Sequence, residues 1–175
     1  TAVVLHGVGR AEQGPVDTAV TDARGGFRFR YTSDTTSVFL LSAGFAGIEY
    51  FSTALQATPG APDTGLILFV ADTSGAAPIG VASRHIVISK PDQSGLRPAL
   101  EIVVLQNGGT VTRVAGDSAH PAWVARLPTG AVGAQAGNGD YSPEALVFRG
   151  DSVLLFAPVA PGDKQIIYTY SLPPN

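Results

Sequence analysis

Short runs of β-branched and aromatic residues, each bounded by turn residues, recur along the whole chain with almost no helical periodicity. Such runs at close spacing are typical of strands connected by turns. The 21 glycines and 13 prolines favour those turns, while 45% hydrophobic residues provide enough apolar surface for a core. The pattern therefore predicts a globular, all-β protein rather than a disordered one. The predicted strands are 2–8, 16–22, 26–31, 37–42, 48–52, 66–70, 84–89, 96–105, 110–114, 123–127, 145–148, 152–156 and 165–170.

One segment has the composition of a linker. Residues 56–64 combine two prolines with a glycine and lack apolar periodicity. We therefore predict two β-sandwich domains, a small one over 1–57 and a larger antiparallel one over 65–175, joined by a linker at 58–64. Within the larger domain, Asn107-Gly108-Gly109 lies between two apolar runs, and these residue types favour the positive φ angles of a tight hairpin turn.

The glycines of the first domain follow a recognisable order. An opening strand ends in Gly7-Val8, a second follows Gly14-Pro15-Val16, and Gly26-Phe27-Arg28-Phe29 comes next. The apolar run 40–45 then precedes Tyr50-Phe51. Over residues 2–53 this order resembles the carboxypeptidase regulatory-like domain, a small transthyretin-like β-sandwich, with phenylalanine at position 45 where tyrosine is common. The resemblance implies an accessory module of the kind found beside peptidases, transporters and surface proteins, and it carries over no catalytic residue.

Composition excludes several kinds of site and partner. Without cysteine there is no disulfide, thiolate nucleophile or thiolate-bound metal. The 14 acidic and 11 basic residues are scattered and give a net charge of −3, so we expect no nucleic-acid partner, because phosphate binding needs a concentrated basic face. No apolar run approaches the roughly 18 residues that span a bilayer, and we expect no transmembrane segment in this chain.

The chain also lacks methionine, so Thr1 is not an intact translation start. Removal of an N-terminal leader would explain this and predicts an extracytoplasmic location, either periplasmic or at the cell surface. A trimmed chain would begin in the same way, so both explanations stay open.

The sequence contains no motif for catalysis, metal binding or a cofactor. Its serines lie in no Gly-x-Ser-x-Gly elbow, and phosphate-cradling loops are absent. The three histidines, His6, His85 and His120, are dozens of residues apart and lack the spacing of metal ligands. We therefore predict a protein that is not an enzyme and has no catalytic residue, no metal site and no cofactor.

One tripeptide, Arg149-Gly150-Asp151, matches the integrin-binding motif. A Gly-Asp turn joining two strands explains the same residues more simply, because tripeptide matches are frequent by chance.

Aromatic residues offer the best candidates for a contact surface. Tyr168 and Tyr170 share one face of a predicted strand by the period-two rule, and with Trp123 they form the predicted interaction surface.

We predict a non-catalytic extracytoplasmic structural or interaction protein, an accessory or membrane-extrinsic subunit that stabilises a larger membrane assembly through contacts with other proteins. The alternative is a glycan- or peptide-binding module of a surface adhesin or extracellular filament, using exposed aromatics or an edge strand.

Overall fold

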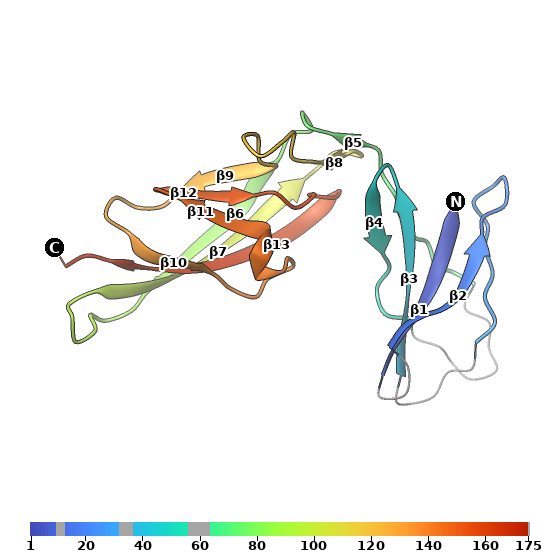
Figure 1. Cartoon of the computed structure of the whole chain (residues 1–175), viewed down its shortest axis with the longest axis horizontal. Helices are drawn as coiled ribbons and strands as arrows, with labels where there is room; N and C mark the ends of the chain where they lie inside the picture. Colours follow the sequence, from blue (N-terminus) through green and yellow to red (C-terminus); the bar gives the residue numbers. More distant parts are fainter. Residues whose placement is uncertain (10–12, 32–36, 56–63, 175) are drawn as a thin grey trace. The chain divides into compact units, whose positions relative to one another are not determined.

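The chain folds into two compact units, Thr1–Ala71 and Asp72–Asn175 (Figure 1). The structure is a computed structural model that describes residues 1–9, 13–31, 37–55 and 64–174. The prediction of an all-β chain is confirmed, because the described residues form strands and one short 3-10 helix, η1 (Pro143–Ala145), and no α-helix. The predicted linker at 58–64 falls almost entirely outside the described residues.

The first unit contains a four-stranded antiparallel sheet in the order β2-β1-β3-β4. Alternation along the strands places Val3 and Leu5 of β1 opposite Ala43 and Leu41 of β3, and all four side chains are buried. These residues and Phe39 form the core of the unit. The strands are β1 (Ala2–Gly9), β2 (Gln13–Val20), β3 (Ser37–Phe45) and β4 (Ile48–Phe51).

Two segments expected to be strands cover this core without pairing as strands. Residues 27–31 and 64–70 carry no strand assignment, so the predictions of strands at 26–31 and 66–70 are wrong. The alternation behind those predictions is nevertheless present, because Phe27, Phe29, Leu66 and Leu68 are partly buried against the core. Residues 66 and 68 therefore contribute to the first unit, although the sequence assigns them to the second.

The second unit contains two antiparallel sheets, ordered β10-β13-β7-β6 and β11-β12-β9, and one short parallel pair, β5-β8. The long strands β7 and β13 pair over their whole lengths. The strands are β5 (Thr73–Ser74), β6 (Gly80–Ile88), β7 (Arg97–Asn107), β8 (Thr112–Arg113), β9 (Trp123–Arg126), β10 (Val132–Ala136), β11 (Leu146–Arg149), β12 (Ser152–Leu155) and β13 (Gly162–Leu172). Strands β5 and β10 were not predicted.

Side chains from both antiparallel sheets meet in one core. Val103 of β7 and Ile166 of β13 belong to the same buried cluster as Val153 and Leu155 of β12. We call the side of the β10-β13-β7-β6 sheet that contacts this cluster its inner face and the opposite side its outer face.

The predicted hairpin at Asn107-Gly108-Gly109 does not form. Strand β7 ends at Asn107, but its partners are β13 and β6 rather than the strand that follows the two glycines. Neither Gly108 nor Gly109 has a positive φ. The buried Asn107 side chain instead donates hydrogen bonds to the carbonyls of Val111 and Val159, both at 2.9 Å, and accepts one from the Gly109 N–H.

Candidate functional site

The predicted aromatic contact surface lies inside the second unit. Tyr168 and Tyr170 share one face of β13 as expected, but that face is the inner one, and their exposed fractions are 0% and 2%. Trp123 of β9 is half-buried and packs against the same core. The two tyrosines are therefore core residues and cannot form an exposed contact surface, because the β11-β12-β9 sheet contributes side chains to the cluster that covers them.

The hydroxyls of both tyrosines donate hydrogen bonds to one buried carboxylate. Glu101 of β7 is completely buried, and its Oε1 accepts a hydrogen bond from the Tyr168 hydroxyl at 2.5 Å. Its Oε2 accepts one from the Tyr170 hydroxyl at 3.1 Å. The guanidinium Nε of Arg84 on β6 donates to Glu101 Oε1 and forms an ion pair with it. Glu101 interrupts the apolar run 99–105 of β7, and a charge inside such a run is the signal in the sequence that points to this site.

Burial and the carboxylate change the acidity of the groups around Glu101. The hydrogen bond to Glu101 raises the pKa of the Arg84 guanidinium, which keeps it charged. Burial, followed by the nearby Glu101 charge, raises the pKa of Tyr170 to about 12. Burial also raises the pKa of Tyr168, further supported by its hydrogen bond to Glu101. These causes favour a charged arginine and neutral tyrosines.

We expect the second unit to lose stability in alkaline solution. A tyrosine whose pKa is raised on folding stabilises the fold fully below its unfolded value near 10, and this contribution disappears as the pH rises through the folded value of about 12. Tyr170 alone should contribute a loss on the order of 2 kcal/mol over that interval. Urea unfolding at several pH values, followed by the fluorescence of Trp123, measures it. A Tyr170→Phe variant should show a shallower decline, and equal slopes for both proteins would contradict the assignment.

The histidines have different local partners, and they belong to different units, His6 to the first and His85 and His120 to the second. His6 Nε2 lies 2.8 Å from Ser42 Oγ, whereas His120 Nδ1 lies 2.9 Å from both carboxylate oxygens of Asp117 in an exposed turn. Among the described residues, no group of three or more His, Asp or Glu side chains is placed to hold a metal ion.

The charged residues of the Arg149-Gly150-Asp151 tripeptide are engaged within the chain. Gly150 and Asp151 form the two-residue turn between β11 and β12, with Gly150 at φ 59°. Asp151 pairs with Arg126 at 3.0 Å, and the Arg149 guanidinium carbon lies 5.7 Å from the centre of the Phe156 ring. The tripeptide therefore has a structural explanation as a hairpin turn.

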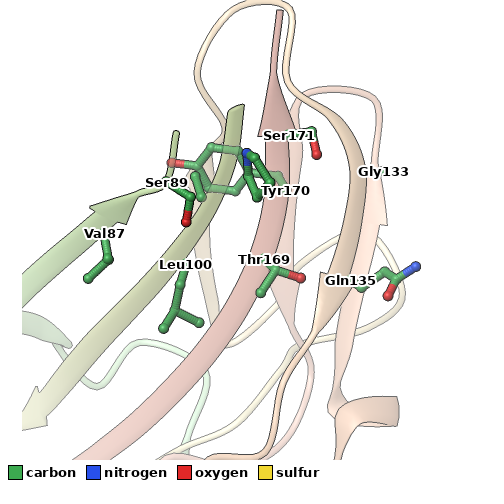
Figure 2. A pocket seen from close by; sticks show the side chains of 10 residues that line it. Val87, Ser89, Leu100, Gly133, Gln135, Thr169, Tyr170 and Ser171 are labelled. Atoms are coloured by element: carbon green, nitrogen blue, oxygen red, sulfur yellow. The ribbon is translucent and has the colours of Figure 1, made fainter. Parts of the chain in front are cut away.

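A shallow depression of about 350 Å³ crosses the outer face of the β10-β13-β7-β6 sheet (Figure 2). Leu100 and Thr169 contribute to its lining between Val87 on one side and Gln135 on the other (Figure 2). Its side chains are apolar, hydroxyl and amide groups, with no ionisable group other than Tyr170. The depression therefore lacks a side chain suited to acid–base catalysis near neutral pH.

Strand β6 is the most unusual exposed element of this unit. Its inner-face residues Arg84, Ile86 and Ile88 are in register with Val103, Glu101 and Ala99 of β7, which are all buried. Yet Ile86 and Ile88 remain 46% and 52% exposed, and Val87 on the outer face is 56% exposed. The core that covers β7 thus stops short of β6, and apolar side chains are exposed on both faces of this strand.

The other sheet edges in the described structure are short or interrupted. Strand β2 contains Pro15 next to a shift in register, β10 shifts register around Gly133, and β4, β9 and β11 have four residues each. Proteins use such features to prevent further strands from pairing at an edge. Strand β6 has nine residues and shifts register between Val81 and Ser83, but its part from Ser83 to Ile88 pairs in one register and contains no proline, glycine or lysine. This part is therefore the longest edge segment without a register shift in the described sheets.

Comparisons with protein-family models, with curated proteins and with solved structures find no match to the chain. In the described part of the chain, no helix has the length and hydropathy needed to cross a bilayer.

Proposed function

We propose that this chain is a non-catalytic interaction protein, an extracytoplasmic accessory or membrane-extrinsic subunit that binds another protein of a larger assembly. The observation that carries the proposal is β6, a long edge strand with apolar side chains half exposed on both of its faces. Exposed apolar surface of this kind is costly in water and commonly marks a site of protein contact.

The proposal includes the architecture of both units. We propose that each is a β-sandwich, the first of the carboxypeptidase regulatory-like type. In support, the apolar face of the first sheet is covered by the extended residues 27–31 and 64–68, and two sheets share one core in the second unit. The resemblance of residues 2–53 to accessory modules of transporters and surface proteins supports the location outside the cytoplasm.

A glycan-binding role has less support. Stacking on sugars needs exposed aromatic rings, and the two tyrosines predicted for such a surface, Tyr168 and Tyr170, are buried, although Phe51 and Phe69 elsewhere are exposed. Of the two roles grouped in the sequence-based alternative, binding of an extended peptide fits the exposed edge of β6 better.

Photo-crosslinking tests whether β6 contacts another protein. A photoreactive phenylalanine analogue in place of Val87, in cells of the native host, should form a discrete adduct of higher mass on illumination. The same analogue in place of Ser118, an exposed turn residue of the same unit, serves as the matched control and should form none. Recovery of the Val87 variant as an uncrosslinked monomer would contradict the proposal.

A further inference from the structure

We propose that β6 accepts an extended strand from another protein, which places apolar side chains opposite Ile86 and Ile88 and a carboxylate opposite Arg84. This inference rests on the proposed function as a protein-binding subunit and adds the mode of binding and the chemistry of the partner. Addition of a strand to a sheet edge gains affinity from backbone hydrogen bonds and specificity from alternate side chains.

The backbone of β6 is arranged to receive such a strand. The Ser89 N–H donates to the Pro98 carbonyl at 2.8 Å, so it faces β7. Because successive residues of a strand direct their backbone groups to opposite sides, the N–H and C=O groups of Ile88, Ile86 and Arg84 point away from β7. Within the described residues no strand pairs with this side of β6. The same three residues therefore offer both unpaired backbone groups and inner-face side chains.

The inner face determines which side chains the added strand would carry. Ile86 and Ile88 are about half exposed because the core cluster does not extend over them. Apolar side chains on a neighbouring strand would complete this layer, since directly opposed residues on one face lie within packing distance. The two positions of the partner strand that lie opposite Ile86 and Ile88 should therefore carry apolar side chains.

Charge argues for a carboxylate at the next alternate position. The Arg84 guanidinium uses its Nε for Glu101, and its side chain is still 41% exposed at the edge. Residues 73–91 include Arg84, His85 and Lys90 and contain no aspartate or glutamate. A second copy of β6 would bring more positive charge to this edge, whereas a partner with a carboxylate would pair with Arg84. Charge complementarity thus favours a different, acidic strand over self-association.

The test supplies such a strand on the full chain. Strands β13 and β6 end at the same side of the sheet, because Leu172 is in register with Arg97 and Ile88 with Ala99. A strand beside β6 would lie three interstrand spacings from β13, roughly 14 Å. A Gly/Ser linker of about 12 residues, with a root-mean-square length of about 19 Å, would bridge this distance. We would append it after Asn175, followed by Thr-Val-Thr-Val-Thr-Glu-Thr running antiparallel to β6.

Amide hydrogen exchange resolved by NMR is the measurement. In the unmodified chain, the amides of His85 and Val87 should be protected, while those of Ile86 and Ile88 should exchange rapidly. The appended strand should slow exchange at Ile86 and Ile88 by about tenfold or more. A matched control with proline in place of both valines should not, because proline lacks the N–H needed for pairing. A second variant with lysine in place of the appended glutamate should show weaker protection.

Each outcome bears on the proposal. Equal exchange in the valine and proline versions would overturn strand addition, and equal protection with glutamate and lysine would overturn the carboxylate. Protection of Ile86 that rises with the concentration of the unmodified chain would overturn the acidic partner and assign the edge to a second copy. A negative exchange result with a positive Val87 crosslink would reject strand addition while the proposed function stands.

Discussion

Replacing Arg84 with methionine is expected to lower the free energy of unfolding of the second unit by about 3 kcal/mol. The substitution keeps most of the apolar stem but removes the positive charge paired with Glu101. Glu101 is completely buried, so the variant would leave a carboxylate in the core with only the two tyrosine hydroxyls as donors. Breaking a buried pair from one side is costly because the remaining charge is desolvated without compensation. Urea unfolding followed by the fluorescence of Trp123, the single tryptophan, measures the second unit directly.

A second arginine–carboxylate pair in the same unit provides the control. Arg126 and Asp151 lie 3.0 Å apart, but their side chains are 81% and 58% exposed. Exposed pairs contribute roughly 0–1 kcal/mol, so Arg126→Met should change stability by less than about 1 kcal/mol. Arg84→Met should also cost less in a Glu101→Gln background, where no carboxylate remains. Similar losses for both arginines, or an unchanged cost in that background, would show that the buried charge is not the cause.

The second large effect is expected at Asn107. An Asn107→Leu substitution keeps a similar volume but removes three hydrogen bonds, to the carbonyls of Val111 and Val159 and from the Gly109 N–H. The Val159 carbonyl keeps the hydrogen bond that it accepts from the Arg113 N–H at 3.0 Å, so the loss falls on the partly buried Val111 carbonyl and Gly109 N–H. A buried polar group left without a partner costs about 1–3 kcal/mol, so a total loss of roughly 2 kcal/mol is expected. Thermal or urea unfolding of the full chain, again followed by Trp123, gives the difference.

A substitution at the neighbouring Gln106 tests whether any amide-to-leucine change at this end of β7 destabilises the fold. Gln106 is exposed, and its amide makes one hydrogen bond, to Asp163 at 3.3 Å. Gln106→Leu should therefore change stability by no more than about 0.5 kcal/mol. If Asn107→Leu were equally mild, its three hydrogen bonds would not hold the 107–111 segment and Val159 together.

Much of the strand content was predictable because strand alternation is a local pattern. The predicted strands at 2–8, 84–89 and 165–170 lie within or largely overlap β1, β6 and β13. Alternation alone does not predict whether a segment pairs as a strand, as segments 26–31 and 66–70 show. Both alternate as expected, yet neither pairs as a strand, because hydrogen-bond partners come from distant parts of the chain.

The candidate site was less predictable for the same reason. Asn107 and its glycines have the residue types of a hairpin turn, but β7 pairs with strands on either side of it, and the amide became a buried hydrogen-bonding group. Glu101 was visible as a charge in an apolar run, but nothing local shows that Arg84 and the two tyrosines would meet it. Those contacts depend on the register between β6, β7 and β13.

The sequence alone predicted an all-β chain with Tyr168 and Tyr170 on one face of a strand, and its lack of cysteine excludes a thiolate metal site. Period-two alternation defines two faces of a strand, but it does not say which face is covered or which edge is left unpaired. Tertiary structure decided both, since it buried the tyrosines around Glu101 and left β6 as the exposed edge. Burial and pairing depend on residues far apart in the chain, and a local pattern carries no information about them.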